Sequence, residues 1–162
     1  KSPKDPCFII NIFDIILTAY IKYSSIVKKK IMNTKLDKIL AEISAGELVD
    51  KITILEIKMI KIKDNSKLKE VDKELKSLNL TFKNFVPNQS LINNWIKKLK
   101  DINLKLWDIE ESKRKAEKNK NFDDNFIQLA RNVYKFNDER ANIKLKINQA
   151  LGSNIKEVKS YE

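Results

Sequence analysis

The chain has three arginines, and all of them lie in its second half, at Arg114, Arg131 and Arg140. Every other basic residue is a lysine. A planar guanidinium binds a carboxylate or a phosphate through two parallel hydrogen bonds, which the ammonium group of lysine cannot reproduce. The arginines are therefore the first residues to consider for a site that recognises an anion.

Arg140 also interrupts an apolar stripe, so its charge needs a partner. If two helices form a hairpin that turns near Lys120, Arg131 lies level with Glu110, and Arg140 lies level with Asp101. Buried charges are normally paired, and fixing the register of helices is their best-attested use. The structural interpretation is an internal ion pair, Arg131–Glu110 or Arg140–Asp101. The functional interpretation is a site for a phosphate, a sugar acid or the carboxylate of a partner.

A second stripe of small and polar side chains lies beside the apolar stripe of the last helix: Ala130, Tyr134, Asn137, Ala141 and Asn148. Such residues allow another helix to approach closely and to form hydrogen bonds. That helix could be the first helix of the same chain, or the last helix of a second copy in a homo-oligomer.

Trp107 lies off the apolar stripe together with Leu104. We expect the helix around residues 48–62 to cover them, whereas an exposed tryptophan would serve as an anchor for a partner. The candidate residues for binding a ligand or a partner are thus Arg131, Arg140, Arg114, Tyr134, Asn137, Trp107 and Glu110.

The composition argues against most kinds of catalytic site. There is no histidine, one cysteine (Cys7) and only two glycines. The commonest general base and metal ligand is therefore missing, and neither a thiolate cluster nor a glycine-rich phosphate loop can form. We predict no catalytic residue, no metal site and no cofactor, and we lean against an enzyme, although Glu, Asp, Lys and Tyr could still perform acid–base chemistry.

Acidic residues occur early in the first predicted helix, at Glu47, Asp50 and Glu56, and as the pair Glu110 and Glu111. They could hold a hard cation only if the fold brought them together. Acids in the first turn of a helix are explained more simply by the helix dipole.

The net charge of +11 does not by itself indicate a nucleic-acid-binding protein. The excess is almost entirely lysine, interleaved with acids, in a chain rich in isoleucine and asparagine, as an AT-rich genome would encode. No aromatic residues are spaced along a basic groove as a single-strand binder requires. We expect no specific nucleic-acid partner.

Two apolar stripes with alternating steps of three and four residues predict the fold. The first is Ile92, Trp95, Leu99, Ile102, Leu106 and Ile109, and the second is Phe122, Phe126, Leu129, Val133, Phe136, Ile143 and Ile147. This spacing places each set on one face of a helix, and two such helices joined by a short link fold back on each other. We predict an antiparallel, coiled-coil-like hairpin of residues 88–118 and 122–151.

Two shorter helices, 46–63 and 66–80, are expected to pack on this hairpin. Ser44 and Glu47 form a capping box before the first helix, and Asp64 caps the second. Residues 81–89, which contain Pro87, are expected to form a loop. The fold class is all-α, a small helical bundle.

Residues 8–27 form the most apolar stretch, but Asp14 and Lys22 interrupt it, so no membrane span is expected. The first methionine is Met32. We interpret residues 1–37 as an extension outside the domain, with Met32 as the expected start, and residues 38–162 as a single helical domain.

From about residue 43 the sequence resembles a bacterial and phage family known as domain of unknown function 6165. The matching stretches are Ser44–Lys58, Leu106–Glu110, Phe126–Arg131, Val133–Tyr134, Asn137–Ala141, Ile143–Lys144 and Gly152–Tyr161. The resemblance implies a small cytoplasmic protein whose relatives lie near surface-polysaccharide genes. It implies no activity and no functional residue.

Two classes of function fit these observations. The first is a non-catalytic interaction or assembly protein, which binds an unidentified protein partner or a second copy of itself through the last helix. The second is a protein that binds an anionic small molecule such as a sugar phosphate, or an accessory to an enzyme of surface-polysaccharide synthesis. A pocket where arginines converge without partner carboxylates would favour the second class.

Overall fold

The computed structural model describes residues 18–25, 39–156 and 158. These residues are all-α, with no strand among them. The chain divides into two compact units, Lys1–Ala41 and Glu42–Glu162. In the first unit, residues 18–25 are helical; the rest of the predicted extension, including Met32, lies outside the described residues. No helix among the described residues combines the length and the apolar content needed to cross a bilayer.

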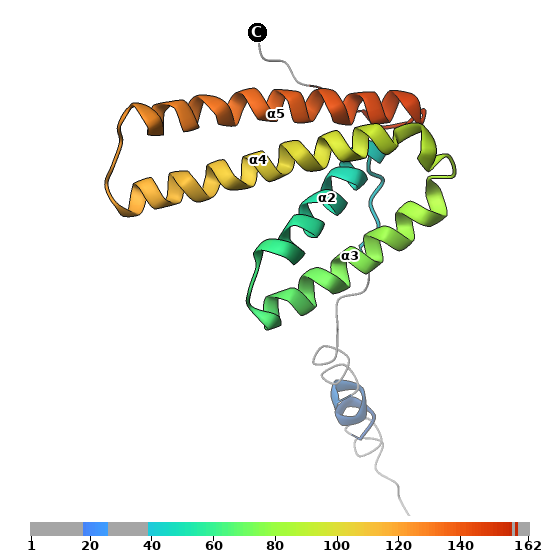
Figure 1. Ribbon diagram of the computed structural model, residues 1–162. Helices are drawn as coiled ribbons and strands as arrows, with labels where there is room; N and C mark the ends of the chain where they lie inside the picture. Colours follow the sequence, from blue (N-terminus) through green and yellow to red (C-terminus); the bar gives the residue numbers. More distant parts are fainter. Residues whose placement is uncertain (1–17, 26–38, 157, 159–162) are drawn as a thin grey trace, which may run out of the picture. The chain divides into compact units, whose positions relative to one another are not determined.

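The second unit is built on a long antiparallel hairpin of α4 (Asn93–Lys118) and α5 (Asp124–Ala150), which lie side by side in Figure 1. A short 3-10 helix, Gln89–Ile92, leads into α4. The predicted apolar stripes face each other along this hairpin and supply much of the core. Their buried members are Ile92, Leu99, Ile102, Leu106, Ile109, Ile143 and Ile147. The prediction of a helical hairpin is therefore confirmed.

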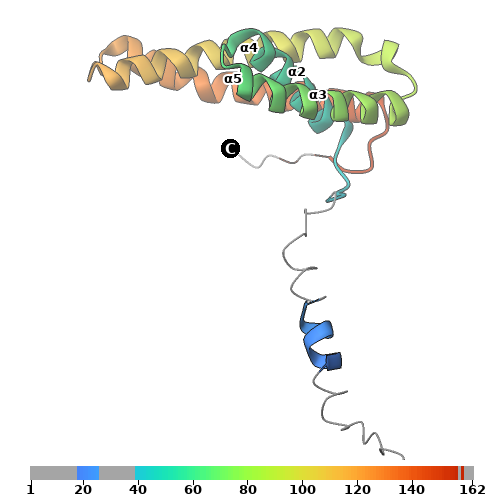
Figure 2. The same cartoon turned by 90° about the horizontal axis from the view of Figure 1, so that it is seen from below.

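Two further helices, α2 (Ala45–Lys61) and α3 (Asn65–Phe85), complete the unit. Helix α2 packs on both α4 and α5, and α3 packs on α2. Figures 1 and 2 both show that α2 and α3 cover only one half of the hairpin, while the half near the α4–α5 turn extends beyond them. Accordingly, Phe122 near that turn remains half exposed.

Helix α3 is longer than the pattern predicted. The helix continues to Phe85 instead of ending at residue 80, so the predicted loop of residues 81–89 shrinks to Val86, Pro87 and Asn88. Phe82 extends the apolar face of α3 by one turn and packs against the core. The helix ends two residues before Pro87 because a proline disfavours helical geometry in the residue before it.

The helix ends follow standard capping rules. The Ser44 hydroxyl accepts a hydrogen bond from the backbone N–H of Glu47 at 3.2 Å, which confirms one half of the predicted capping box. The other half is not made, because the Glu47 carboxylate pairs with Lys144 of α5 at 3.0 Å. Asp64 caps α3 as predicted, by accepting hydrogen bonds from the backbone N–H groups of Ser66 and Lys67.

Both hairpin helices end in a Schellman turn, in which the two residues after the cap donate to carbonyls of the last turn. In α5 the left-handed position is Gly152, with φ of 64°. In α4 it is Lys120, with φ of 53°. A lysine in this conformation carries strain that a glycine would avoid.

The start of α2 lies directly against α5. The backbone N–H of Gly46 donates to the buried side chain of Asn148 at 2.6 Å. A Cβ at position 46 would lie 2.5 Å from the backbone oxygen of Lys144, so only glycine fits there. Near the C-terminal end of α5, the second stripe therefore packs against α2 of the same chain. This was one of its two predicted partners.

Candidate functional site

A buried polar network joins α2, α4 and α5 near the middle of the hairpin. At its centre is Asp50 of α2, which is 1% exposed. Its carboxylate accepts hydrogen bonds from Nε and Nη2 of Arg140, the former at 2.8 Å, and from Nδ2 of Asn103 at 2.9 Å. Asn103 Nδ2 also donates to the Thr53 hydroxyl at 2.9 Å, and that hydroxyl donates to the backbone oxygen of Asp50.

This network corrects the predicted ion pairs. Arg140 is paired internally, but with Asp50 of α2 and not with Asp101 of α4. Glu110 pairs with Lys113 within α4 instead of with Arg131. The prediction considered only which residues of α4 and α5 lie opposite each other. The acid that neutralises Arg140 comes instead from α2, which crosses both helices.

A pocket of about 550 Å³ lies beside this network, where α2 passes over the hairpin. We call it the junction pocket. It is lined by Ile54 and Ile57 of α2, by Asn103, Leu106, Trp107, Glu110, Glu111 and Arg114 of α4, and by Arg140 of α5. Its volume is typical of pockets that hold small organic ligands, and such pockets commonly combine apolar walls with a few polar groups.

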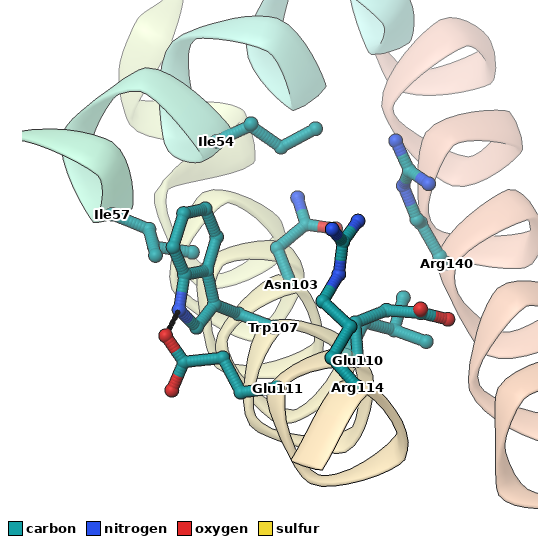
Figure 3. A pocket seen from close by; sticks show the side chains of 9 residues that line it. Ile54, Ile57, Asn103, Trp107, Glu110, Glu111, Arg114 and Arg140 are labelled. Carbon is teal, nitrogen blue, oxygen red and sulfur yellow. Dashed lines mark hydrogen bonds between the residues drawn. The ribbon is translucent and has the colours of Figure 1, made fainter. Parts of the chain in front are cut away.

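Trp107 and Ile57 lie on one side of the pocket in Figure 3, and Arg140 lies on the other. The indole Nε1–H donates to the Glu111 carboxylate at 2.8 Å, which fixes the orientation of the ring. Trp107 is half buried and lines the pocket together with Ile54 and Ile57 of α2, so α2 covers it in part, as predicted. Leu104 stays 38% exposed, so the expectation that α2 would cover both residues holds only for Trp107.

Arg114 is the other arginine of the junction pocket. In Figure 3 its side chain projects from α4 on the side that faces the pocket. Among the described residues, the structure gives Arg114 no ion pair and no side-chain hydrogen bond. The Glu110 carboxylate nearby is occupied by Lys113 at 3.0 Å. Arg114 is therefore the cation at this pocket that is available to an incoming group.

The structure brings together four of the seven predicted site residues, since Arg114, Arg140, Trp107 and Glu110 all line the junction pocket. Asn137 lies just behind them, with its Oδ1 3.4 Å from Nη1 of Arg140. Arg131 and Tyr134 are exposed on α5 and do not line the pocket. Arg131 therefore does not share this pocket with Arg140.

Sequence reasoning missed several residues of the site, among them Asp50 and Asn103 of the polar network and Ile54 and Ile57 of the pocket wall. Asp50 was attributed to the helix dipole, yet it lies in an otherwise apolar part of α2, between Val49 and Ile52. A polar residue within such a run is a sign of a buried, paired group. Asn103 carries the same sign between Ile102 and Leu106, and both could have been found in this way.

The arrangement suits binding better than proton transfer. Each carboxylate at or beside the pocket is engaged: Asp50 by Arg140, Glu110 by Lys113 and Glu111 by Trp107. Within the described part of the chain, no three His, Cys, Asp or Glu residues are grouped so as to hold a metal ion.

Comparison with known proteins assigns the second unit to a family. No curated protein and no solved structure matches the chain. A family match covers residues 39–162, which includes every helix from α2 to α5 and every residue of the junction pocket. The chain therefore belongs to the family of unknown function DUF6165.

Proposed function

We propose that this protein is a non-catalytic helical binding protein and that the junction pocket is its binding site. The observation that carries this proposal is the combination of an apolar hollow of about 550 Å³ with a rigid polar wall. The Asp50–Arg140–Asn103 network fixes that wall, because its hydrogen bonds join all three helices that line the pocket. A wall that is already ordered costs little entropy when a ligand binds.

The apolar residues of the pocket supply the free energy of binding. Ile54, Ile57, Leu106 and Trp107 offer aliphatic and aromatic surface from two helices. Burial of such surface contributes about 25 cal/mol per Å². The polar groups at the rim then determine which molecule is accepted and in which orientation.

The test is binding of the fluorescent probe 1-anilinonaphthalene-8-sulfonate to the folded protein. We expect one molecule per chain, with enhanced emission. The variant Ile54→Trp fills the pocket and should abolish this signal. The control Ile60→Trp adds the same side chain to a residue of α2 that is 73% exposed and should leave the signal intact. Equal probe binding by both variants would contradict the proposal.

Binding of an anionic sugar phosphate is a second candidate, in line with the surface-polysaccharide genes near which the resemblance places relatives of this chain. Arg114, which has no ion pair with any residue that the structure describes, favours it. Arg140 does not, because its charge is balanced by Asp50. A sugar phosphate that competes with the fluorescent probe in the parent protein, but not in Arg114→Gln, would support this candidate.

Self-association through α5 is a third candidate, which one observation favours. Helix α2 contacts the second stripe at Asn148, but Ala130 and Tyr134 are exposed. Light scattering on the parent and on Tyr134→Glu tests this role. A dimer that the substitution dissociates would support self-association, and a monomeric parent would exclude it.

A further inference from the structure

The orientation of Asn103 indicates what the junction pocket recognises. The Asp50 carboxylate can only accept hydrogen bonds, and the Thr53 hydroxyl uses its proton on a backbone oxygen. Both must therefore face the amide nitrogen of Asn103, which donates to each at 2.9 Å. The amide oxygen is consequently held on the other side of the group.

That oxygen is an acceptor without a donor. Asn103 is 5% exposed and lines the pocket, yet its Oδ1 receives no hydrogen bond from any described residue. This oxygen is not fully enclosed, and because Asn103 lines the pocket, its remaining exposed surface opens to the pocket. A ligand that leaves this oxygen unpaired would lose free energy, whereas one with an N–H group at that point would satisfy it.

The shape of the pocket adds a second requirement. The indole of Trp107 forms one side and is fixed by its hydrogen bond to Glu111. An aromatic side chain of this kind contributes most when a flat ring stacks on it. Ile54 and Ile57 continue the apolar surface next to the indole.

Arg114 adds a third requirement. Its guanidinium is a forked donor without a partner among the described residues, and its side chain projects into the pocket. Two neighbouring pairs cancel, since Glu110 pairs with Lys113 and Arg140 with Asp50. The Glu111 carboxylate, held by the neutral indole N–H of Trp107, adds one negative charge to the pocket wall. This balance favours a ligand with a single acidic group rather than a polyanion.

We infer, on the basis of the proposed binding role, that the junction pocket takes a flat heteroaromatic molecule with an N–H donor on one edge and one acidic group on the other, as in a nucleoside monophosphate. The N–H group donates to Oδ1 of Asn103, the ring lies against Trp107, and the acidic group accepts hydrogen bonds from Arg114.

Three matched ligands test this inference without disturbing the buried network. Adenosine 5′-monophosphate carries all three features, purine riboside 5′-monophosphate lacks the exocyclic amine, and adenosine lacks the phosphate. Titration calorimetry should give the tightest binding for adenosine 5′-monophosphate. Loss of the amine should weaken binding about tenfold or more, since it strands a buried acceptor. Loss of the phosphate should weaken it about tenfold.

Protein variants supply the second half of the test. Arg114→Gln should remove the difference between adenosine 5′-monophosphate and adenosine. Arg131→Gln removes the same charge from an exposed residue outside the pocket and should keep that difference. Equal binding with and without the amine, or equal effects of the two variants, would overturn the inference.

The inference and the proposed function can fail separately. If the fluorescent probe binds in the pocket and Ile54→Trp blocks it, but the nucleotide does not compete at millimolar concentration, the ligand class is wrong and the binding role stands. If Ile54→Trp weakens the binding of neither the probe nor the nucleotide, both the ligand class and the binding role are wrong.

Discussion

Replacement of Arg140 by leucine should destabilise the fold strongly, because it leaves the Asp50 carboxylate buried without its cation. Asp50 is the more deeply buried partner, with a side chain 1% exposed against 27% for Arg140. Arg140→Leu removes two charge-assisted hydrogen bonds from that carboxylate and leaves only the one from Asn103. Breaking a buried pair in this way costs about 3–5 kcal/mol.

Removal of the acid should cost less. In Asp50→Asn the guanidinium of Arg140 loses its counter-charge, but it borders the junction pocket and can be hydrated there. The retained amide oxygen can still accept one hydrogen bond. We expect a loss of about 1–3 kcal/mol. The double variant removes both charges, so its loss should fall short of the sum of the single losses by at least about 2 kcal/mol.

Urea unfolding at neutral pH, followed by helical circular dichroism, measures these differences as shifts of the midpoint at constant slope. Lys76→Leu is a suitable control, because it breaks the exposed pair with Asp72 and should change stability by less than about 1 kcal/mol. A loss below about 1 kcal/mol for Arg140→Leu, or additive losses in the double variant, would refute the reasoning.

Three further predictions concern the helix ends. Gly46→Ala should cost about 1–3 kcal/mol in urea unfolding, because the new Cβ meets the backbone of α5 at 2.5 Å; a midpoint like that of the parent would show that α2 does not lie so close. Lys120→Gly should raise the free energy of unfolding by about 1 kcal/mol by relieving the left-handed strain, and a lower melting temperature would count against the Schellman turn at that position. The hydrogen bond from the Ser66 hydroxyl, with those from the backbone N–H groups of Lys67 and Ser66, lowers the pKa of Asp64 below its usual 3.8. A depressed folded-state pKa gives stability that is present above 3.8 and lost as the pH falls through the lower value. The gap between the parent and Asp64→Ala should therefore close in acid, while Asp64→Asn should show no such loss of capping, and a gap that is constant with pH would contradict this.

The sequence was sufficient to predict the hairpin because its two apolar stripes are long and regular. Residues such as Leu99 and Ile147 recur at helical spacing, and burial of such a face decides the pairing of the helices. Two features were harder to predict from the sequence. The end of α3 depended on whether Phe82 continued the helix, and that choice is made by its contact with the core. The strain at Lys120 could not be foreseen from a residue type that rarely adopts positive φ.

The site was predicted only in part, for a related reason. Arg114, Arg140, Trp107 and Glu110 were selected by their chemistry and do line one pocket. The side on which α2 crosses the hairpin is a property of tertiary packing, so the partner of Arg140 could not be deduced from the spacing of α4 and α5. Asp50 became identifiable as that partner only once α2 had been placed.

The most direct test of the binding role uses the two tryptophan indole N–H signals in a nitrogen–proton correlation spectrum of the parent protein. Trp107 lines the junction pocket, whereas Trp95 contacts Lys98 and Lys146 elsewhere on the hairpin and serves as an internal control. During titration with adenosine 5′-monophosphate, we expect the Trp107 signal to shift and saturate while the Trp95 signal stays in place. If neither the nucleotide nor the fluorescent probe shifts the Trp107 signal, the assignment of this pocket as the binding site is contradicted.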